Sequence, residues 1–208
     1  MSESTEIAMS ESAAPPGAED DRLTGDAGNT AKALIALTRL VEDLRDREQI
    51  RELFNRYGFA ADTGDAREWS ETYAATGTYD GVGGRMTGRA QFFDAIDNPT
   101  GVHKRDIECF GSLHTTGPLT MRIDGDSAWA EGYAIVWIRS ADASYRVYSM
   151  SYNHWDLQRS GGKWEIFHRR SRPVSPGAAT AVFTEWKAAG PLPGELSSLT
   201  RRGPAPVE

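Results

Sequence analysis

DGDSAWAEGYAIVWIRSADASYRVYSMSYNHWDLQRSGGKWEIFHRRSRPV, residues 124–174, is the stretch that decides the fold. Two turn sequences, Asp124–Asp126 and Ser160–Gly162, separate segments rich in aromatic and β-branched residues. Such an alternation is typical of β-hairpins. We therefore expect a meander of long antiparallel strands over residues 127–139, 145–159 and 163–174. A long strand over residues 107–123, broken near Gly117 and Pro118, is expected to precede it.

Side chains on a strand alternate between its two faces, which predicts the residues that look inward. If no bulge intervenes, one face of the last strand carries Trp164, Ile166, His168, Arg170 and Arg172. This face starts apolar, so we expect it to face the core and to become polar toward Arg172. One face of the preceding strand carries Ser149, Ser151, Asn153, Trp155 and Leu157.

Upstream of the strands the apolar residues recur with helical spacing. Intervals of three or four residues separate Leu34, Leu37, Val41 and Leu44. The pattern resumes at Ile50, Leu53, Phe54, Tyr57 and Ala61. This indicates a long amphipathic helix, or two in tandem, that starts near Thr30 and stops at the turn Asp62–Asp65. Two short helices are expected over residues 66–73, which hold Trp69, and 88–96, with strands over 76–84 and 85–87 between them.

Helices followed by long strands predict an α+β domain over residues 30–174, with the helices on one face of a curved sheet that encloses a pocket. Residues 1–29 have little to bury, and we expect a disordered acidic tail there. Six of the ten prolines lie from Pro173 onward. We read residues 175–208 as a proline-rich tail with a short helix over 179–189, whose Phe183 and Trp186 would pack on the pocket mouth or on a neighbouring subunit.

Charge and cysteine content exclude several classes of protein. The net charge is −7, and residues 1–29 account for six of these charges, with seven acidic residues and one arginine. The folded part therefore lacks the basic surplus of a nucleic-acid-binding protein. Cys109 is the only cysteine, so neither an intrachain disulfide nor a cysteine-rich metal site is expected. Without a secretory signal or an apolar run long enough to span a bilayer, we expect a cytoplasmic protein without a membrane partner.

Several short motifs occur in an order that resembles a known family. They are Asp46-Arg-Glu-Gln-Ile50, Tyr57-Gly-Phe-Ala-Ala-Asp62, Gly111-Ser-Leu-His114-Thr-Thr, Ile123-Asp-Gly-Asp-Ser-Ala-Trp-Ala130 and Gly162-Lys-Trp-Glu-Ile166. Over roughly Leu40 to Val174, the chain resembles the SnoaL-like branch of the NTF2-like cone fold. That branch includes scytalone dehydratase, bile acid 7α-dehydratase and hexachlorocyclohexane dehydrochlorinase.

The resemblance implies a set of site residues. Tyr57 and Asp62 match a catalytic Tyr and Asp five residues apart, and His114 matches the catalytic His that precedes the Gly/Pro break. Arg172 matches an Arg eight residues after the aromatic of the last strand. The pair Ser151 and Asn153 matches a Ser-x-Asn pair that lines the pocket of scytalone dehydratase. A second His of that enzyme has no counterpart in residues 134–139, which puts a scytalone-type activity in doubt. His168 and Trp69 are added as candidate substrate-binding residues.

Such a set can perform chemistry without a cofactor or a metal. Proton abstraction next to a carbonyl needs a base poised near neutral pH, and a His paired with a buried Asp supplies one. A Tyr and an Arg can donate hydrogen bonds to the oxyanion or to the leaving group. In a continuous helix, however, residues five apart point roughly 140° apart. Tyr57 and Asp62 are therefore expected to converge only if the helix frays before Asp62.

Each of these residues also has a structural interpretation. His114 could be a satisfied core His, Asp62 a turn residue, Tyr57 a capped core ring and Arg172 half of an ion pair at the sheet edge. His103 and His154 are expected to be structural. Glycines 81, 83 and 84 indicate a hairpin turn rather than a phosphate loop, since no βαβ unit surrounds them.

Three functions remain open at this point. The first is a cofactor-independent lyase of the dehydratase type, acting on a cyclic or polycyclic carbonyl compound. The second is an isomerase, cyclase or epoxide hydrolase of natural-product biosynthesis, because a fold does not fix a reaction. The third is a non-catalytic binding or assembly module, in which His114 and Asp62 would not touch. The resemblance also implies a homodimer or homotrimer that associates through the outer face of the sheet.

Overall fold

The computed structural model describes residues 18–81 and 84–189 of the 208-residue chain. Contacts divide the chain after Leu44 into a helical unit and an α+β unit that starts at Arg45. The helices are α1 (Ala18–Thr63), α2 (Ala66–Glu71), α3 (Gly88–Asp97), the π-helix η1 (His103–Ile107), the 3-10 helix η2 (Glu108–Phe110), α4 (Ala178–Val182) and α5 (Glu185–Ala189). The strands are β1 (Tyr73–Gly81), β2 (Gly84–Thr87), β3 (Ser112–Asp124), β4 (Ser127–Arg139), β5 (Tyr145–Ser160) and β6 (Lys163–Pro173).

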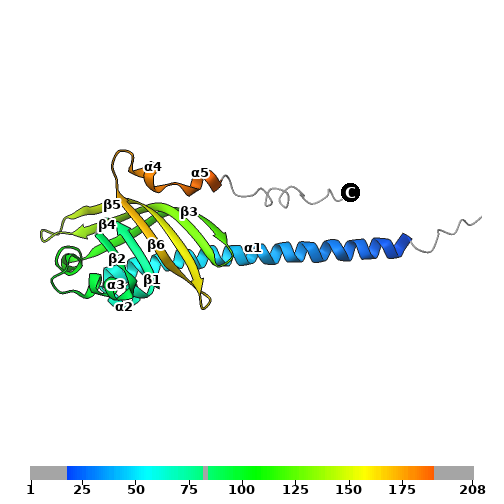
Figure 1. Cartoon of the computed structure of the whole chain (residues 1–208), viewed down its shortest axis with the longest axis horizontal. Helices are drawn as coiled ribbons and strands as arrows, with labels where there is room; N and C mark the ends of the chain where they lie inside the picture. Colours follow the sequence, from blue (N-terminus) through cyan, green and yellow to red (C-terminus); the bar gives the residue numbers. More distant parts are fainter. Residues whose placement is uncertain (1–17, 82–83, 190–208) are drawn as a thin grey trace, which may run out of the picture. The chain divides into compact units, whose positions relative to one another are not determined.

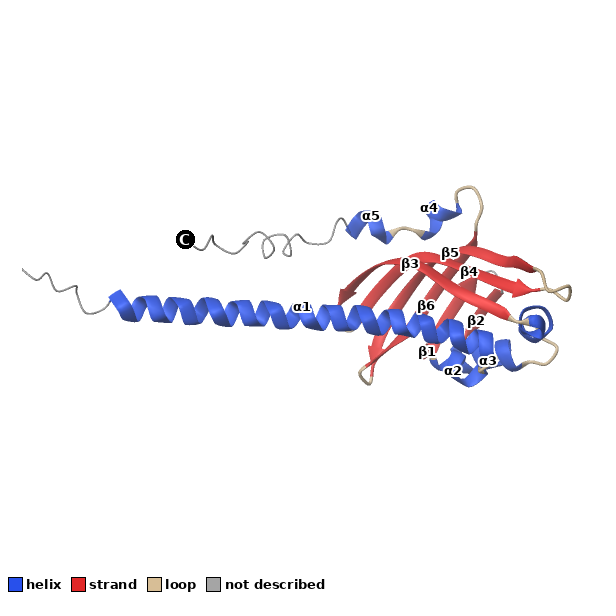
Figure 2. Ribbon diagram, turned by 180° about the vertical axis from the view of Figure 1, so that it is seen from behind, coloured by secondary structure: helices blue, strands red, loops and turns tan. Residues whose placement is uncertain are grey.

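The six strands form one curved sheet in the order β2-β1-β6-β5-β4-β3 (Figure 1). All neighbours are antiparallel except β1 and β6, which run parallel. In Figure 2, α2 and α3 lie on one side of the sheet, and α4 and α5 lie on the other. The α+β class, the N-terminal helices and the curved sheet are therefore confirmed.

The core forms between the inner face of the sheet and the helices α1, α2 and α3. Phe54 of α1 packs on Trp155 of β5, with ring centroids 4.8 Å apart. Tyr73 stacks on Phe92 of α3 at 3.9 Å, and Trp69 contacts both rings at 5.7 and 5.9 Å. Burying these large rings supplies much of the driving force for folding, since each aromatic side chain removes roughly 150–250 Å² from water.

Helix α1 is a single helix of 46 residues rather than two in tandem. It begins at Ala18 and therefore includes residues 18–29 of the expected tail, whereas residues 1–17 lie outside the described part. No proline occurs between Ala18 and Asp62, and a helix extends readily once it has been nucleated. In the described part of the chain, no helix is both long and apolar enough to cross a bilayer.

The strand expected from Ile107 starts only at Ser112, because a π-helix and a 3-10 helix take up residues 103–110. Gly111, with a φ of 102°, makes the turn into β3. Only a glycine adopts this conformation without strain. This detour brings His103 next to the end of α1, which the strand pattern alone could not predict.

The C-terminal segment packs on the outer face of the sheet, and the expected single helix is split into α4 and α5. Phe183 lies between the two helices and contacts the rings of Tyr133 and Tyr152 at 5.6 and 5.4 Å. The Glu131 carboxylate accepts hydrogen bonds from the backbone N–H groups of Thr184, Glu185 and Trp186 at 2.8–3.1 Å. Phe183 is therefore bound to the chain's own sheet and not to the pocket mouth. Residues 190–208 of the expected tail lie outside the described part.

A bulge in β6 reverses the expected faces of that strand. Ile166 pairs with Leu157 and His168 with Asp156, so Phe167 is an extra residue in the ladder. An extra residue shifts every following side chain to the opposite face. Trp164 and Ile166 point inward as predicted, but beyond the bulge the buried side chains are Arg169 and Ser171.

Candidate active site

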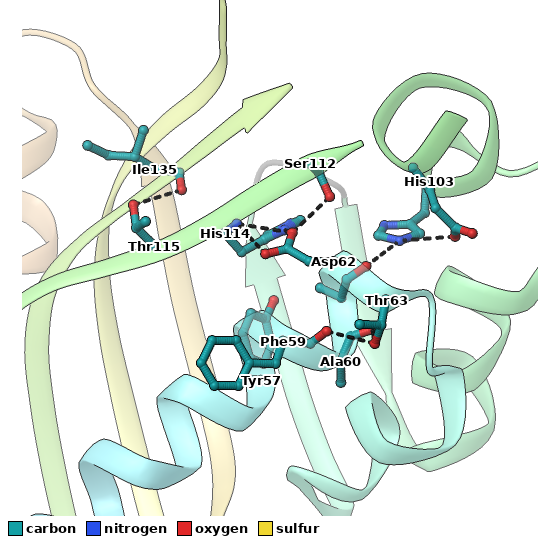
Figure 3. Close-up of polar contacts among 12 residues, drawn as sticks. Tyr57, Phe59, Ala60, Asp62, Thr63, His103, Ser112, His114, Thr115 and Ile135 are labelled. Carbon is teal, nitrogen blue, oxygen red and sulfur yellow. Dashed lines mark hydrogen bonds and ion pairs between the residues drawn. The ribbon is translucent and has the colours of Figure 1, made fainter. Parts of the chain in front are cut away.

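Asp62, in the last turn of α1, is the centre of a hydrogen-bond network with β3. Figure 3 shows its carboxylate between His114 and Ser112. Oδ1 accepts a hydrogen bond from the Ser112 hydroxyl at 2.8 Å and lies 2.6 Å from His114 Nδ1. The backbone N–H of His114 donates to Oδ2 at 2.9 Å. Burial disfavours the charged form, but the hydrogen bonds from His114 and Ser112 outweigh it and lower the pKa of Asp62.

The lowered pKa keeps Asp62 ionised, so its carboxylate can accept the proton of His114 Nδ1 and leave Nε2 to act on a bound molecule. The His114 side chain is 14% exposed and lines a cavity between the helices and the sheet. No described residue forms a hydrogen bond with its Nε2. A carboxylate that orients an imidazole in this way gives a general base that can accept a proton from a bound molecule.

Glycine at position 58 allows this contact between helix and strand. A Cβ atom built on Gly58 would lie 3.0 Å from the His114 carbonyl oxygen and 3.7 Å from the His114 Cβ. Gly58 lies one turn of α1 before Asp62. A side chain at position 58 would therefore push β3 away from the helix where the Asp62–His114 bond forms.

The cavity has a volume of about 580 Å³, in the range of pockets that hold small organic molecules. Its wall combines aromatic rings from both helices and strands with short side chains from the strands. Among the lining residues are Tyr57, Trp69, Tyr73, Tyr79, His103, His114, Thr116, Ala134, Ser151, Trp155, Arg169 and Ser171.

Tyr57 and Arg169 form a polar pair in the cavity wall. Arg169 Nη1 donates to the Tyr57 hydroxyl at 2.6 Å, and Nε and Nη2 donate to the side-chain oxygen of Asn153 at 3.0 and 2.8 Å. Burial raises the pKa of Tyr57, although the Arg169 charge partly opposes this. The Tyr57 hydroxyl therefore keeps its proton. Since its oxygen accepts from Arg169, that proton is available to a ligand.

Tyr57 and Asp62 do not have to converge, and α1 does not fray between them. The helix continues to Thr63, so the two side chains leave it in different directions. Tyr57 lines the cavity itself. Asp62 does not line it, and it can influence a bound molecule only through the ring of His114, which β3 places between Asp62 and the cavity.

Some of the other candidate residues lie at the cavity and others lie away from it. Trp69 and Ser151 line the cavity. Asn153 is fully buried behind it, where it holds Arg169 and donates to the Ser151 hydroxyl at 2.9 Å. His168 and Arg172 were expected in the pocket and are not among its lining residues. His168 Nδ1 lies 2.6 Å from the Thr78 hydroxyl, and Arg172 forms an ion pair with Asp80 at 2.9 Å.

Arg169 and His103 are among the lining residues that were not predicted from the sequence. Arg169 takes the position expected for Arg172 because of the Phe167 bulge, for which the sequence gives no signal. His103 was interpreted as structural. It is buried, its Nε2 donates to the Ala61 carbonyl at 3.0 Å, and its ring lies 6.3 Å from that of His114. Burial and the nearby His114 lower the pKa of His103, so it is a neutral neighbour of the base.

Comparisons with known proteins agree with this architecture. An NTF2-like protein with a cystatin-like fold from Novosphingobium aromaticivorans is 33% identical, with a TM-score of 0.65 over 71% of this chain and 95% of its own. A protein of unknown function from Mycobacterium tuberculosis is 23% identical, with a TM-score of 0.59 over 69% of this chain and 80% of its own. Aln2 from a Streptomyces species is 17% identical, with a TM-score of 0.55 over 62% of this chain and 91% of its own.

A search of functionally curated proteins finds no significant match. The sequence profile of the SnoaL-like domain, in contrast, matches residues 42–170, which is most of the chain. Proteins with this domain include dehydratases, cyclases and isomerases. The match covers the second half of α1, strands β1 to β5 and most of β6, and it includes Asp62, His114 and Arg169. This chain therefore belongs to the SnoaL-like family of NTF2-like proteins.

Proposed function

We propose that this protein is a cofactor-independent lyase of the dehydratase type that acts on a cyclic, carbonyl-containing small molecule. The observation that carries the proposal is the 2.6 Å contact between Asp62 and His114, whose ring lines the cavity. A non-catalytic binding module would not need a buried carboxylate to orient an imidazole whose second nitrogen is left free.

In the proposed reaction, His114 Nε2 removes a proton from the carbon next to the substrate carbonyl. Asp62 stabilises the imidazolium that forms, and the Tyr57 hydroxyl donates a hydrogen bond to the carbonyl oxygen as it gains negative charge. The electrons of the C–H bond form a C=C bond, and the C–O bond of a β-hydroxyl group breaks. The proton on His114 passes to the departing hydroxide, so one water leaves and the base is regenerated.

The same first step would begin an isomerisation, in which His114 returns the proton to a different carbon. Product mass distinguishes the two reactions, because a lyase product has lost one water and an isomerase product has the mass of its substrate. Cyclic β-hydroxy ketones are suitable trial substrates. We expect loss of water as the outcome, and formation of equal-mass products alone would favour the isomerase.

Proton abstraction can be tested before the substrate is known. 2-Tetralone has acidic C–H groups next to its carbonyl, and NMR in deuterated buffer measures their exchange. We expect the wild-type protein to accelerate this exchange and His114→Ala to abolish the acceleration. His154→Gln is a matched control, because His154 is also buried beside carboxylates but lies outside the cavity. Equal exchange in wild type and His114→Ala would contradict the proposed base.

A further inference from the structure

Arg169 is a buried cation without an acidic partner among the described residues. The residue is 7% exposed, and its hydrogen bonds go to Tyr57 and Asn153, both uncharged. Two other arginines of the sheet form ion pairs, Arg159 with Asp46 and Arg172 with Asp80. An arginine keeps its charge inside a protein, and a buried charge that has no partner typically costs several kcal/mol.

The surroundings of Arg169 compensate this charge only in part. Its guanidinium carbon lies 5.2 Å from the Tyr57 ring centroid, 5.3 Å from that of Tyr79 and 5.5 Å from that of Trp155. Such cation–π contacts are favourable. They cover the guanidinium with rings but do not accept its N–H groups.

Hydrogen-bond donors at this site remain unused. Three of the five N–H groups of Arg169 are bonded to Tyr57 and Asn153, which leaves one N–H on each terminal nitrogen. The Ser171 hydroxyl is also buried without a hydrogen-bond partner in the described chain. The Tyr73 hydroxyl interacts with Arg169, and the Trp69 indole interacts with Tyr57, but the O–H of Tyr73 has no acceptor among the described residues. Tyr73, Ser171 and Trp69 line the cavity together with Arg169. Buried polar groups are usually satisfied, so several unused donors in one cavity wall indicate a ligand.

The nearest carboxylates do not neutralise Arg169. Asp62 lies behind His114, is held by His114 and Ser112, and forms no ion pair with Arg169. Asp94 lines the cavity but is exposed to solvent. The group that would satisfy the site must therefore carry negative charge and several acceptor lone pairs, as a carboxylate does.

We propose that Arg169, Tyr73 and Ser171 bind a carboxylate of the substrate, so that the enzyme acts on a cyclic carboxylic acid in its anionic form. This inference rests on the proposed function for the carbonyl chemistry but concerns a different subsite. Arg169 Nη1 is bonded to the Tyr57 hydroxyl at 2.6 Å. The carboxylate and the carbonyl that Tyr57 contacts therefore lie on the same side of the bound ring. The substrate class is a cyclic keto acid, whose rings pack against Trp69 and Tyr73.

The experiment compares two probes that differ only in charge, 2-naphthoate and 2-naphthamide, by isothermal titration calorimetry with the full chain. We expect wild type to bind naphthoate at least about 10-fold more tightly than the amide, since a charge-assisted pair exceeds a neutral one by about 1.4 kcal/mol or more. Arg169→Gln should reduce the ratio to about one. Arg172→Gln is the matched control, because this arginine lies outside the cavity, and it should keep the wild-type ratio.

If Arg169→Gln does not fold, the double variant Tyr73→Phe/Ser171→Ala removes only the two hydroxyl groups. It should weaken naphthoate binding by about 10-fold and leave amide binding unchanged. Equal affinities of wild type for the two probes, or no naphthoate binding at millimolar concentration, would overturn the proposal. His114→Ala separates the two hypotheses, because it should lose 2-tetralone exchange and keep the preference for naphthoate.

Discussion

His114 Nδ1 lies 2.6 Å from the Asp62 carboxylate, and this contact joins the end of α1 to the start of β3. The two residues are 52 positions apart in the chain. The same carboxylate accepts the His114 backbone N–H, so it fixes both the strand and the ring. A base that is held at its main chain and its side chain loses little entropy when it reacts, which favours catalysis.

Replacing Asp62 by Asn should lower activity without unfolding the protein. The amide can still occupy the site, but it cannot stabilise the imidazolium and it favours the wrong tautomer of His114. We expect 2-tetralone exchange to fall by about 100-fold or more. Circular dichroism should show an intact fold. An Asp62→Asn variant with wild-type exchange would mean that His114 works without its carboxylate.

Tyr57→Phe tests the proposed hydrogen bond to the carbonyl oxygen. Loss of one donor to a developing oxyanion typically costs about 100- to 1,000-fold in rate. The change also leaves Arg169 Nη1 without its acceptor, so we expect a loss of roughly 1–3 kcal/mol in the free energy of unfolding. Urea denaturation and the exchange assay measure the two effects separately. Unchanged exchange in a destabilised variant would assign Tyr57 a structural role only.

Gly58→Ala should disturb the site while leaving overall stability nearly unchanged. Alanine favours the helix by about 1 kcal/mol, but its Cβ would approach the His114 carbonyl to 3.0 Å. The resulting shift of β3 would misplace the base, for which an error of about 1 Å can cost 100-fold in rate. Gly28→Ala is the control, because a Cβ there meets no atom within 4 Å. The prediction fails if both variants exchange 2-tetralone at the wild-type rate.

His154 should make stability depend on pH. Burial opposes its charge, but hydrogen bonds to Asp156 and Glu131 outweigh this and raise the pKa of His154 above 6.5. The resulting stabilisation is complete below the ordinary pKa and is lost as the pH rises through the raised value. His154→Gln should therefore lower the free energy of unfolding more at about pH 6 than at about pH 9. Urea titrations at both pH values measure this, and a deficit that grows with pH would contradict the prediction.

The outer face of the sheet is where we expect subunits to associate. Leu113, Trp137 and Val147 are adjacent in the register of β3, β4 and β5, and they are 55%, 37% and 37% exposed. We expect a dimer or trimer in light scattering, which Trp137→Glu should convert to a monomer because it places a charge in an apolar contact. Phe59→Glu, at an exposed apolar position of α1, is the control. A wild-type monomer at micromolar concentration would refute the association.

Much of the secondary structure could be predicted from local pattern. The bounds of β4, Ser127–Arg139, match the prediction, because turn residues on both sides leave little choice of register. The turn after Asp62 was also predicted, and Gly64 adopts a φ of 68° there. The extent of α1 and the helical turns of residues 103–110 were not predicted, because both depend on how far a helix propagates and on what it packs against.

By itself the sequence determined the order of helices and strands, the curved sheet and, through its motifs, the pairing of Asp62 with His114. The order of elements and the curved sheet follow from periodicity and turn residues, which act over a few positions of the chain, whereas the pairing of Asp62 with His114 was implied by the family resemblance. Only the tertiary structure decided which arginine of β6 enters the cavity. One extra residue at Phe167 exchanges the faces of the strand, so Arg169 is buried and Arg172 pairs with Asp80. A bulge depends on pairing with the neighbouring strand, and that pairing exists only in the folded sheet.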